Sequence, residues 1–277
     1  MKKIEQNIPV VRHLDDVDDL LKFGRDSELV PGQELEAGEI AGDILEEARK
    51  EGKKAIIFVC SDKKRAVQTA ELVASHIKNV DEKMKLRVVK EGRLSSIDQG
   101  EIILPPDYKA GDHFEGLPLA NKIFNKEVFS DEIANDLYRF GDPIKLEDGS
   151  YKYPELATYF RGYGENNKEL MARIYELIIE TSEKIDKLNE RTKVVVITHS
   201  QLYQIFRNMR SVAQKIKNNE LEFHTGELPR LCWKVYKEKS KDNQPTYKDY
   251  FIPIEDLCDP KIVELLKKEL EYLTNLK

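Results

Sequence analysis

The stretch that decides the fold runs from Ala55 to Ala70 and reads AIIFVCSDKKRAVQTA. Its first six residues are continuously apolar, as in a strand that is buried on both faces of a parallel sheet. After the turn at 61–64, apolar residues recur at helical spacing from Val67 to Ile77, which predicts an amphipathic helix. A buried strand followed at once by such a helix is the repeating unit of an α/β fold.

Other parts of the chain extend this alternation. Valine-rich or apolar runs predict strands at Val10–Val11, at Leu86–Lys90 and at Lys193–Thr198. Helical spacing, caps and breakers predict helices over 38–50, from Gly164 onward, over 200–209, and from Pro260 after the N-cap Asp259. We therefore expect a three-layer α/β sandwich with a mostly parallel central sheet, formed by residues 1–277 as a single domain.

Residues 101–163 interrupt the pattern. About sixty residues without a parallel-sheet pattern are too many for a plain loop, so we expect an inserted cap. A helix is expected within 121–140 and turns at 141–143 and 147–149. The many aromatic side chains of this region either fill a small core of its own or form a lid over a site. Two further strands, at 231–236 and 247–252, are expected to form a hairpin.

Composition limits the classes of partner. The chain has 277 residues, of which 40% are hydrophobic and 35% charged, and its net charge is -6. No basic face is indicated for nucleic acid or an anionic membrane. The three cysteines, Cys60, Cys232 and Cys258, form neither a disulfide framework nor a C-x-x-C pair, and no long apolar run follows the lysines at the N-terminus. We expect a cytoplasmic monomer or homodimer.

Histidines stand where two predicted strands end. His13 follows the first valine run beside Arg12, and His199 follows the last, while Arg65 lies near the start of a helix. Ligands of open α/β sheets bind at the carboxyl ends of the strands, and helix N-termini favour anions. A guanidinium holds phosphate and a neutral imidazole can attack phosphorus, so these residues predict a phosphate site. Taken singly, each is also compatible with a surface arginine or a hydrogen-bonded buried histidine.

Four aspartates, at positions 15, 16, 18 and 19, follow His13 closely. They are either caps at a helix N-terminus or, with His13, ligands of a metal ion. No second cluster of His and Asp follows nearby, so we expect capping and neither a metal nor another cofactor.

In combination, these segments resemble the histidine phosphatase superfamily, in its phosphoglycerate mutase-like branch. The likeness covers most of the chain. Four segments carry the likeness, and they come in the order found in the family. Arg12-His13 matches the start of the family's Arg-His-Gly motif, and Ser61–Ala70 matches its Ser-x-x-x-Arg-Ala-x-Gln-Thr-Ala motif. Gly164-Glu165 with Arg173 resembles its Gly-Glu-Ser helix start, and Thr198-His199 resembles the segment of its second catalytic histidine.

The resemblance implies a phosphomonoesterase that acts without a metal. His13 would attack phosphorus and become a phosphohistidine, which water then hydrolyses. Arg12, Arg65 and His199 would surround the transferring group and neutralise its oxygens in the transition state. Ser200 is expected to bind substrate together with the two arginines. The substrate would be a small phosphorylated metabolite.

The chain departs from the family at three positions. Leu14 replaces the glycine after the nucleophile and is expected to crowd the phosphate pocket. Ser96 stands at the position of the mutase-like proton donor, a glutamate, and Ser200 at the aspartate of the acid-phosphatase branch. Asp98 and Glu101 are the expected substitutes as general acid, although both are equally explained as solvated loop carboxylates.

Two functions therefore remain open. The first is an active phosphatase; a phosphomutase is less favoured, since it needs the same missing donor and a closed pocket. The alternative is a catalytically weak or inactive relative that binds a phosphorylated ligand or a partner. Two histidines around one phosphate favour the enzyme, because a binding protein has no need of both.

Overall fold

The computed structural model describes residues 8–15, 27–96, 101–102, 144–145, 151–152, 160–161, 167–185, 191–222, 224–228 and 256–275. Four strands of this part form one parallel sheet in the order β1-β8-β2-β3. Their bounds are β1 Val10–Arg12, β8 Thr192–Thr198, β2 Ala55–Cys60 and β3 Lys85–Lys90. β8 therefore lies between the two strands that carry the N-terminal motifs, although it comes last in the sequence.

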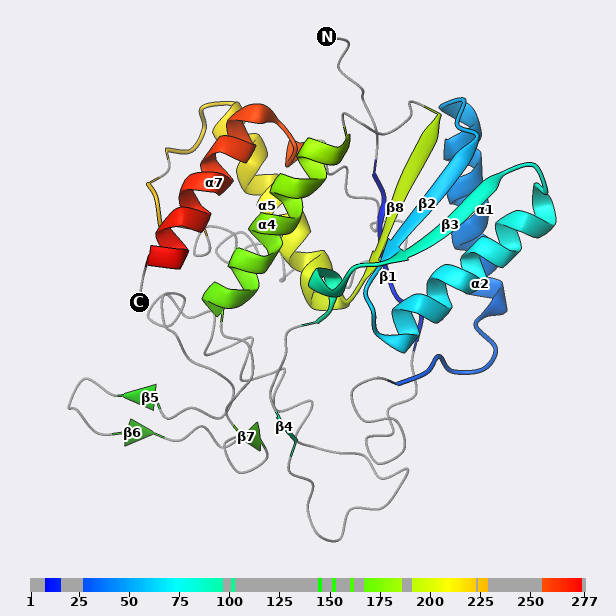
Figure 1. The fold of residues 1–277 in the computed structure, drawn as a ribbon, viewed down its shortest axis with the longest axis horizontal. Coiled ribbons are helices and arrows are strands. Elements are labelled where there is room, and N and C mark those ends of the chain that lie inside the picture. The colour runs from blue at the N-terminus through cyan, green and yellow to red at the C-terminus, as the bar shows by residue number, and fades with distance from the viewer. Residues whose placement is uncertain are drawn as a thin grey trace, which may run out of the picture.

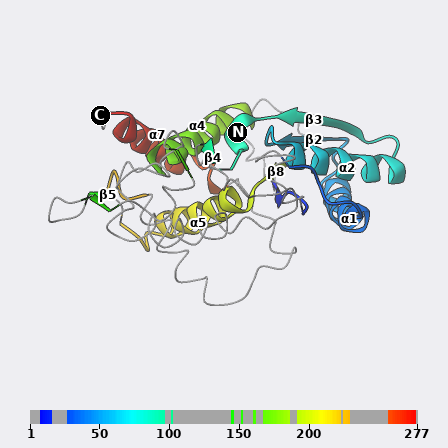
Figure 2. The same ribbon diagram turned by 90° about the horizontal axis from the view of Figure 1, so that it is seen from below.

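Helices cover both faces of this sheet (Figure 1). One face is packed by α1 Glu34–Lys50 and α2 Lys64–Val80, which also contact each other. The other is packed by α4 Asn167–Ile185 and α5 Ser200–Lys217, with α7 Pro260–Asn275 lying against α4. The view from below shows the same separation into layers (Figure 2). The fold is the expected α/β sandwich with a parallel sheet.

The side chains of the central strand β8 point alternately into the two cores, which explains why its sequence is continuously apolar. In β8, Val194 and Val196 belong to the core beneath α4 and α5, whereas Val195 and Ile197 belong to the core beneath α1 and α2. Side chains of successive strand residues point to opposite faces, so a strand covered on both faces needs apolar residues at every position.

Two helices differ in extent from the prediction. α1 begins at Glu34 rather than at 38, because the turn ends at Gly32, which has a φ of 91°, and the acidic Glu34 and Glu36 favour a helix N-terminus. α5 continues to Lys217 rather than ending at 209, and the buried residues Val212, Ala213 and Ile216 prolong its stripe. α4 is described from Asn167 onward, and Gly164 and Glu165, where its start was predicted, lie outside the described residues.

Within 101–163, the structure describes two short antiparallel pairs. β4 Glu101–Ile102 pairs with β7 Phe160–Arg161, which brings the two ends of the segment together. β5 Ile144–Lys145 pairs with β6 Tyr151–Lys152 around the predicted turn at 147–149. The helix predicted within 121–140 and the strands predicted at 231–236 and 247–252 lie outside the described residues.

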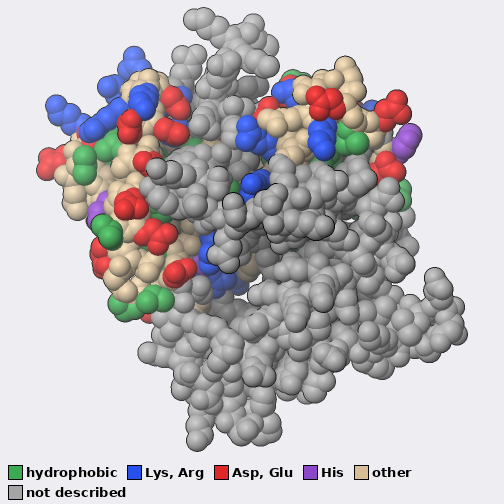
Figure 3. All heavy atoms as spheres, turned by 180° about the vertical axis from the view of Figure 1, so that it is seen from behind, with side chains coloured by type: hydrophobic (Ala, Val, Ile, Leu, Met, Phe, Trp, Pro, Cys, Tyr) green, Lys and Arg blue, Asp and Glu red, His purple; other side chains and the backbone are tan. Residues whose placement is uncertain are grey.

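The described surface mixes charges of both signs. On the face in Figure 3, both acidic and basic side chains are present on the described elements. Among the helices that the structure describes, none has the length and apolar character that a bilayer-spanning segment requires.

Candidate active site

The candidate site lies at the carboxyl ends of three neighbouring strands. His13 follows β1, His199 follows β8 and Ser61 follows β2. Two backbone hydrogen bonds hold these ends in register: the amide of His13 donates to the Thr198 carbonyl at 2.9 Å, and that of Ser61 to the Ile197 carbonyl at 3.0 Å. Strand order thus brings together side chains from opposite ends of the sequence, at the edge where α/β sheets bind ligands.

Arg65 joins the two histidines. Its Nε donates to Nε2 of His13 at 3.2 Å and to Nδ1 of His199 at 3.3 Å. The imidazole rings meet edge to face, with their centroids 4.9 Å apart and an angle of 60° between their planes. A further guanidinium nitrogen of Arg65 donates to Oγ of Ser27 at 3.3 Å. Three of the predicted site residues therefore form one cluster, and both histidines are buried.

The hydrogen bonds of His13 fix which ring nitrogen carries the proton. Its Nδ1 lies 2.6 Å from the carbonyl oxygen of Leu14. A carbonyl can only accept, so Nδ1 is the protonated nitrogen of the neutral ring and Nε2 keeps its lone pair. Nε2 is also the atom that accepts from Arg65. His13 therefore presents a nucleophilic nitrogen to the same point in space as a cation that can hold phosphate.

Burial keeps His199 uncharged. Its pKa is lowered to about 2, mainly because burial disfavours the charged ring and also because the cations Arg65, Lys63 and Arg173 act on it. Since Nδ1 of the neutral ring accepts from Arg65, Nε2 carries the proton and donates to Oγ of Ser61 at 2.9 Å. His199 therefore has the opposite tautomer to His13.

Thr69 of the Gln-Thr-Ala sequence fastens α2 to the segment that carries His13. Its hydroxyl accepts from the backbone amide of Leu14 at 3.1 Å and donates to the Arg65 carbonyl at 2.7 Å. The preceding Gln68 accepts from the amide of Leu29 at 2.9 Å. Thr69 thus joins the segment of His13 to the helix turn of Arg65, a role that the sequence analysis did not assign to it.

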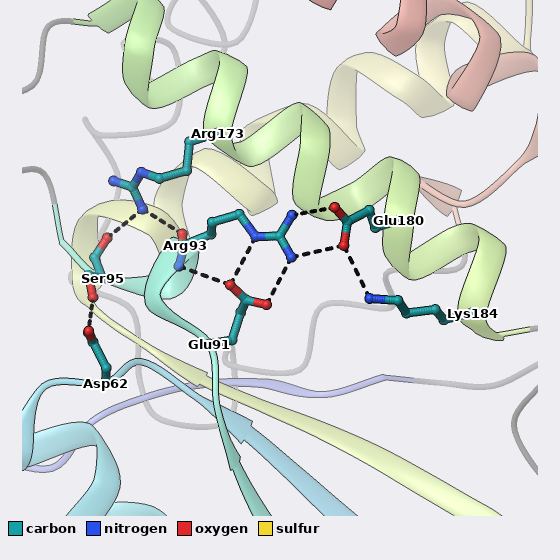
Figure 4. A network of polar contacts seen from close by, with 7 residues as sticks. All are labelled: Asp62, Glu91, Arg93, Ser95, Arg173, Glu180 and Lys184. Carbon is teal, nitrogen blue, oxygen red and sulfur yellow. Dashed lines mark hydrogen bonds and ion pairs between the residues drawn. The ribbon is translucent and has the colours of Figure 1, made fainter.

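The loop after β3 approaches the site and is held by two arginines (Figure 4). Arg173 on α4 donates to the backbone carbonyls of Arg93 and Ser95, the latter at 3.0 Å. The guanidinium of Arg93 pairs with Glu91 at 2.9 Å and with Glu180 on α4 at 3.0 Å. These contacts anchor the short 3-10 helix Gly92–Leu94, labelled η1, to the helix layer.

Arg12 has a more open position than the other candidates. Its side chain is 40% exposed, and its guanidinium lies 3.8 Å from Asp15. Its Nε is buried and meets no hydrogen-bond partner among the described residues. The structure therefore places Arg12 next to His13 in the chain but gives it no hydrogen bond to the histidine cluster within the described part.

Leu14 does not crowd the pocket as expected. Its side chain is 3% exposed and belongs to the core beneath α1 and α2. A bulky residue is accommodated here because it faces the helices, while the backbone of Leu14 serves the site through its carbonyl and amide.

The remaining candidates are described only in part. Glu101 lies in β4 and Ser200 is the first residue of α5, but neither side chain belongs to the described structure. Asp98 lies outside the described residues. Sequence reasoning missed Ser27, Ser61, Thr69 and Ser95 as members of the site. Ser61 and Thr69 had a signal, their place in the quoted motif.

Within the described ranges, no three His, Cys, Asp or Glu side chains gather in a group that could hold a metal ion. The chain matches no known family model, and no curated protein is similar to it at a significant level. The function is therefore inferred from the site itself.

Proposed function

We propose that the protein is a phosphomonoesterase that needs no metal and acts through a phosphohistidine on a small phosphorylated metabolite. The observation that carries this proposal is Nε of Arg65, which donates to lone pairs of both His13 and His199. A nucleophilic nitrogen, a second imidazole and a guanidinium at one point are suited to holding and attacking a phosphoryl group.

The reaction would proceed in two displacements. Nε2 of His13 attacks phosphorus, the bond from phosphorus to the ester oxygen breaks, and the leaving alcohol takes up a proton. Water then attacks the phosphohistidine, which releases inorganic phosphate and restores the ring. Splitting the hydrolysis in this way replaces one difficult step by two easier ones.

The charges around the site favour an anion. The cations whose charge lowers the pKa of His199, after the larger effect of burial, are Arg65, Lys63 and Arg173. Preorganised positive charge stabilises the equatorial oxygens of a transferring phosphoryl group most where water is excluded. Such a site would accept phosphate esters in preference to neutral substrates.

The leaving alcohol needs a proton donor, for which Asp98 and Glu101 are the proposed residues. Ser96, at the family's glutamate position, is half-buried and has no ionisable group. Esters with leaving groups of low pKa need the least assistance, so we expect aryl phosphates to react faster than alkyl phosphates. A mutase is less favoured for the same lack of a donor at position 96.

Ser96 also supports the second candidate function, a protein that binds a phosphorylated ligand without turning it over. The test is to incubate the purified protein with a panel of aryl and alkyl phosphates in the presence of a chelator. We expect phosphate release that disappears in His13→Ala. The exposed His224 provides the matched control, since His224→Ala should retain activity.

Trapping separates the two functions. Rapid quench with a labelled aryl phosphate should leave acid-labile, base-stable label on wild-type protein and none on His13→Ala. Saturable binding of the same esters with neither release nor label would overturn the enzyme and support the binding protein.

A further inference from the structure

A chain of hydrogen bonds leads from His199 away from the proposed phosphate position. Oγ of Ser61 lies 2.9 Å from Nε2 of His199 and 3.1 Å from Oγ of Ser95, whose hydroxyl donates to Asp62 at 2.5 Å. We call Ser61, Ser95 and Asp62 the Asp62 chain. It starts at a fully buried serine and ends at an exposed carboxylate.

The direction of every proton in the Asp62 chain is fixed from its outer end. An ionised carboxylate only accepts, so the Ser95 hydroxyl must donate to Asp62. The oxygen of Ser95 can then only accept a hydrogen bond from the Ser61 hydroxyl. Because that hydroxyl has a single proton, Ser61 has none left to donate elsewhere. Ser61 in turn accepts, from the amide of Lys63 at 3.2 Å and from Nε2 of His199.

The contact between His199 and Arg65, which is separate from the Asp62 chain, requires the same tautomer. Nε of Arg65 is always a donor, so Nδ1 of His199, at 3.3 Å, must accept. The proton of the neutral ring is therefore on Nε2. Two separate sets of contacts thus give His199 the same tautomer, with its lone pair toward His13.

Hydrogen bonds to the backbone at Leu94 and Ser95 hold Ser95 in place beside Ser61. The carbonyl of Ser95 accepts from Arg173, and the carbonyl of the adjacent Leu94 accepts from the Thr198 hydroxyl at 2.7 Å. Thr198 is the residue immediately before His199. The loop that supplies Ser95 is therefore tied to α4, as Figure 4 shows, and also to the strand end that supplies His199.

This tautomer has a consequence for ligand binding. A phosphate oxygen that takes the place of the Arg65 Nε–H at Nδ1 meets a lone pair, and two lone pairs repel unless a proton lies between them. We propose that the Asp62 chain positions His199 so that a phosphoryl group binds together with one proton, shared between a phosphate oxygen and Nδ1. The proton comes from the phosphate monoanion or, for a dianion, from solvent; no other bond forms or breaks. This inference rests on the proposed function in taking the ligand to be phosphate.

Nuclear magnetic resonance of protein with 15N-labelled histidine tests the tautomer without any ligand. We expect the His199 resonances, assigned with His199→Gln, to show Nε2 protonated and Nδ1 unprotonated. In Ser95→Ala the Ser61 hydroxyl loses its acceptor and can turn toward the ring, which leaves the contact with Arg65 alone to favour the Nε2 proton. Some of the Nδ1-protonated form should therefore appear, and Asp62→Asn should shift the population in the same direction. Identical spectra in all three proteins, or a wild-type proton on Nδ1, would overturn the inference.

Calorimetry tests the shared proton. Titrating inorganic phosphate at about pH 8 in two buffers of different ionisation enthalpy gives the number of protons taken up, expected to be about one for wild type. Ser95→Ala should take up fewer, because its ring can donate from Nδ1. Ser75→Ala, an exposed serine on α2, is the control and should match wild type. No uptake by a wild type that binds phosphate would contradict the proposal.

The two readouts separate this inference from the proposed function. A wild type that neither binds nor hydrolyses phosphate compounds would overturn the function and the proton uptake together. The tautomer of His199 would still be measured, and a proton on Nε2 that moves in Ser95→Ala would uphold the positioning role.

Discussion

The hydroxyl of Thr69 accepts a hydrogen bond from the backbone amide of Leu14 at 3.1 Å, which joins α2 to the loop that carries His13. Both residues are buried. In Thr69→Val this amide loses its partner without a change in side-chain shape, which should lower the free energy of unfolding by about 1–3 kcal/mol. Chemical unfolding measures the loss. Thr69→Ser keeps the hydroxyl and should recover most of it; equal losses in both variants would show that the methyl group matters instead.

Arg65 should be essential in a way that lysine cannot replace. Its Nε contacts both histidines while another nitrogen contacts Ser27, and a lysine has no such fork. We expect Arg65→Lys to lower kcat on an aryl phosphate by roughly 10²–10³, the usual effect of removing a transition-state donor. Steady-state kinetics measures it. A variant that changes only KM would place Arg65 in ground-state binding alone.

Glu269 on α7 should make stability fall as the pH rises. Its side chain is fully buried, Oε1 accepts from the backbone amide of Gly226, and Oε2 has no hydrogen-bond partner among the described residues. Burial raises the pKa of this carboxyl above its ordinary value of 4.5. The folded state then binds this proton more tightly than the unfolded state, so the contribution of Glu269 to stability is fully present below pH 4.5 and is lost as the pH rises through the raised pKa.

Urea unfolding across this pH range tests the effect of Glu269. In Glu269→Gln, which stays neutral, the decrease with pH should be smaller than in wild type. Glu271→Gln, an exposed position on the same helix, should follow the wild-type curve. Parallel curves for all three proteins would mean that Glu269 does not titrate in this range.

Cys60, the last residue of β2, should resist thiol reagents. Its side chain is fully buried, and burial raises the pKa of its thiol to about 11, so little thiolate forms near neutral pH. Cys258 is partly exposed. Alkylation followed by peptide mass spectrometry should modify Cys258 well before Cys60, and the difference should disappear in denaturant. Faster modification of Cys60 would show that β2 opens readily.

Much of the sandwich follows from the sequence alone. Continuous apolar runs locate β2 and β8, because a strand covered on both faces needs apolar residues at each position. Periodicity also locates the main helices, although it misses the first turn of α1 and the second half of α5. Since parallel strands expose their carboxyl ends at one edge, the sequence also predicts that His13 and His199 lie at that edge.

Only the tertiary structure decides how these residues work together. Sheet order places β8 beside β1, so His199 meets His13 across most of the chain. The contacts of Thr69, Ser61 and Ser95 join loops far apart in sequence, and no local pattern records them. The periodicity of apolar residues encodes which face of a strand or helix is buried. The proton positions of an imidazole depend instead on which donors and acceptors the folded chain brings within about 3 Å of each ring nitrogen.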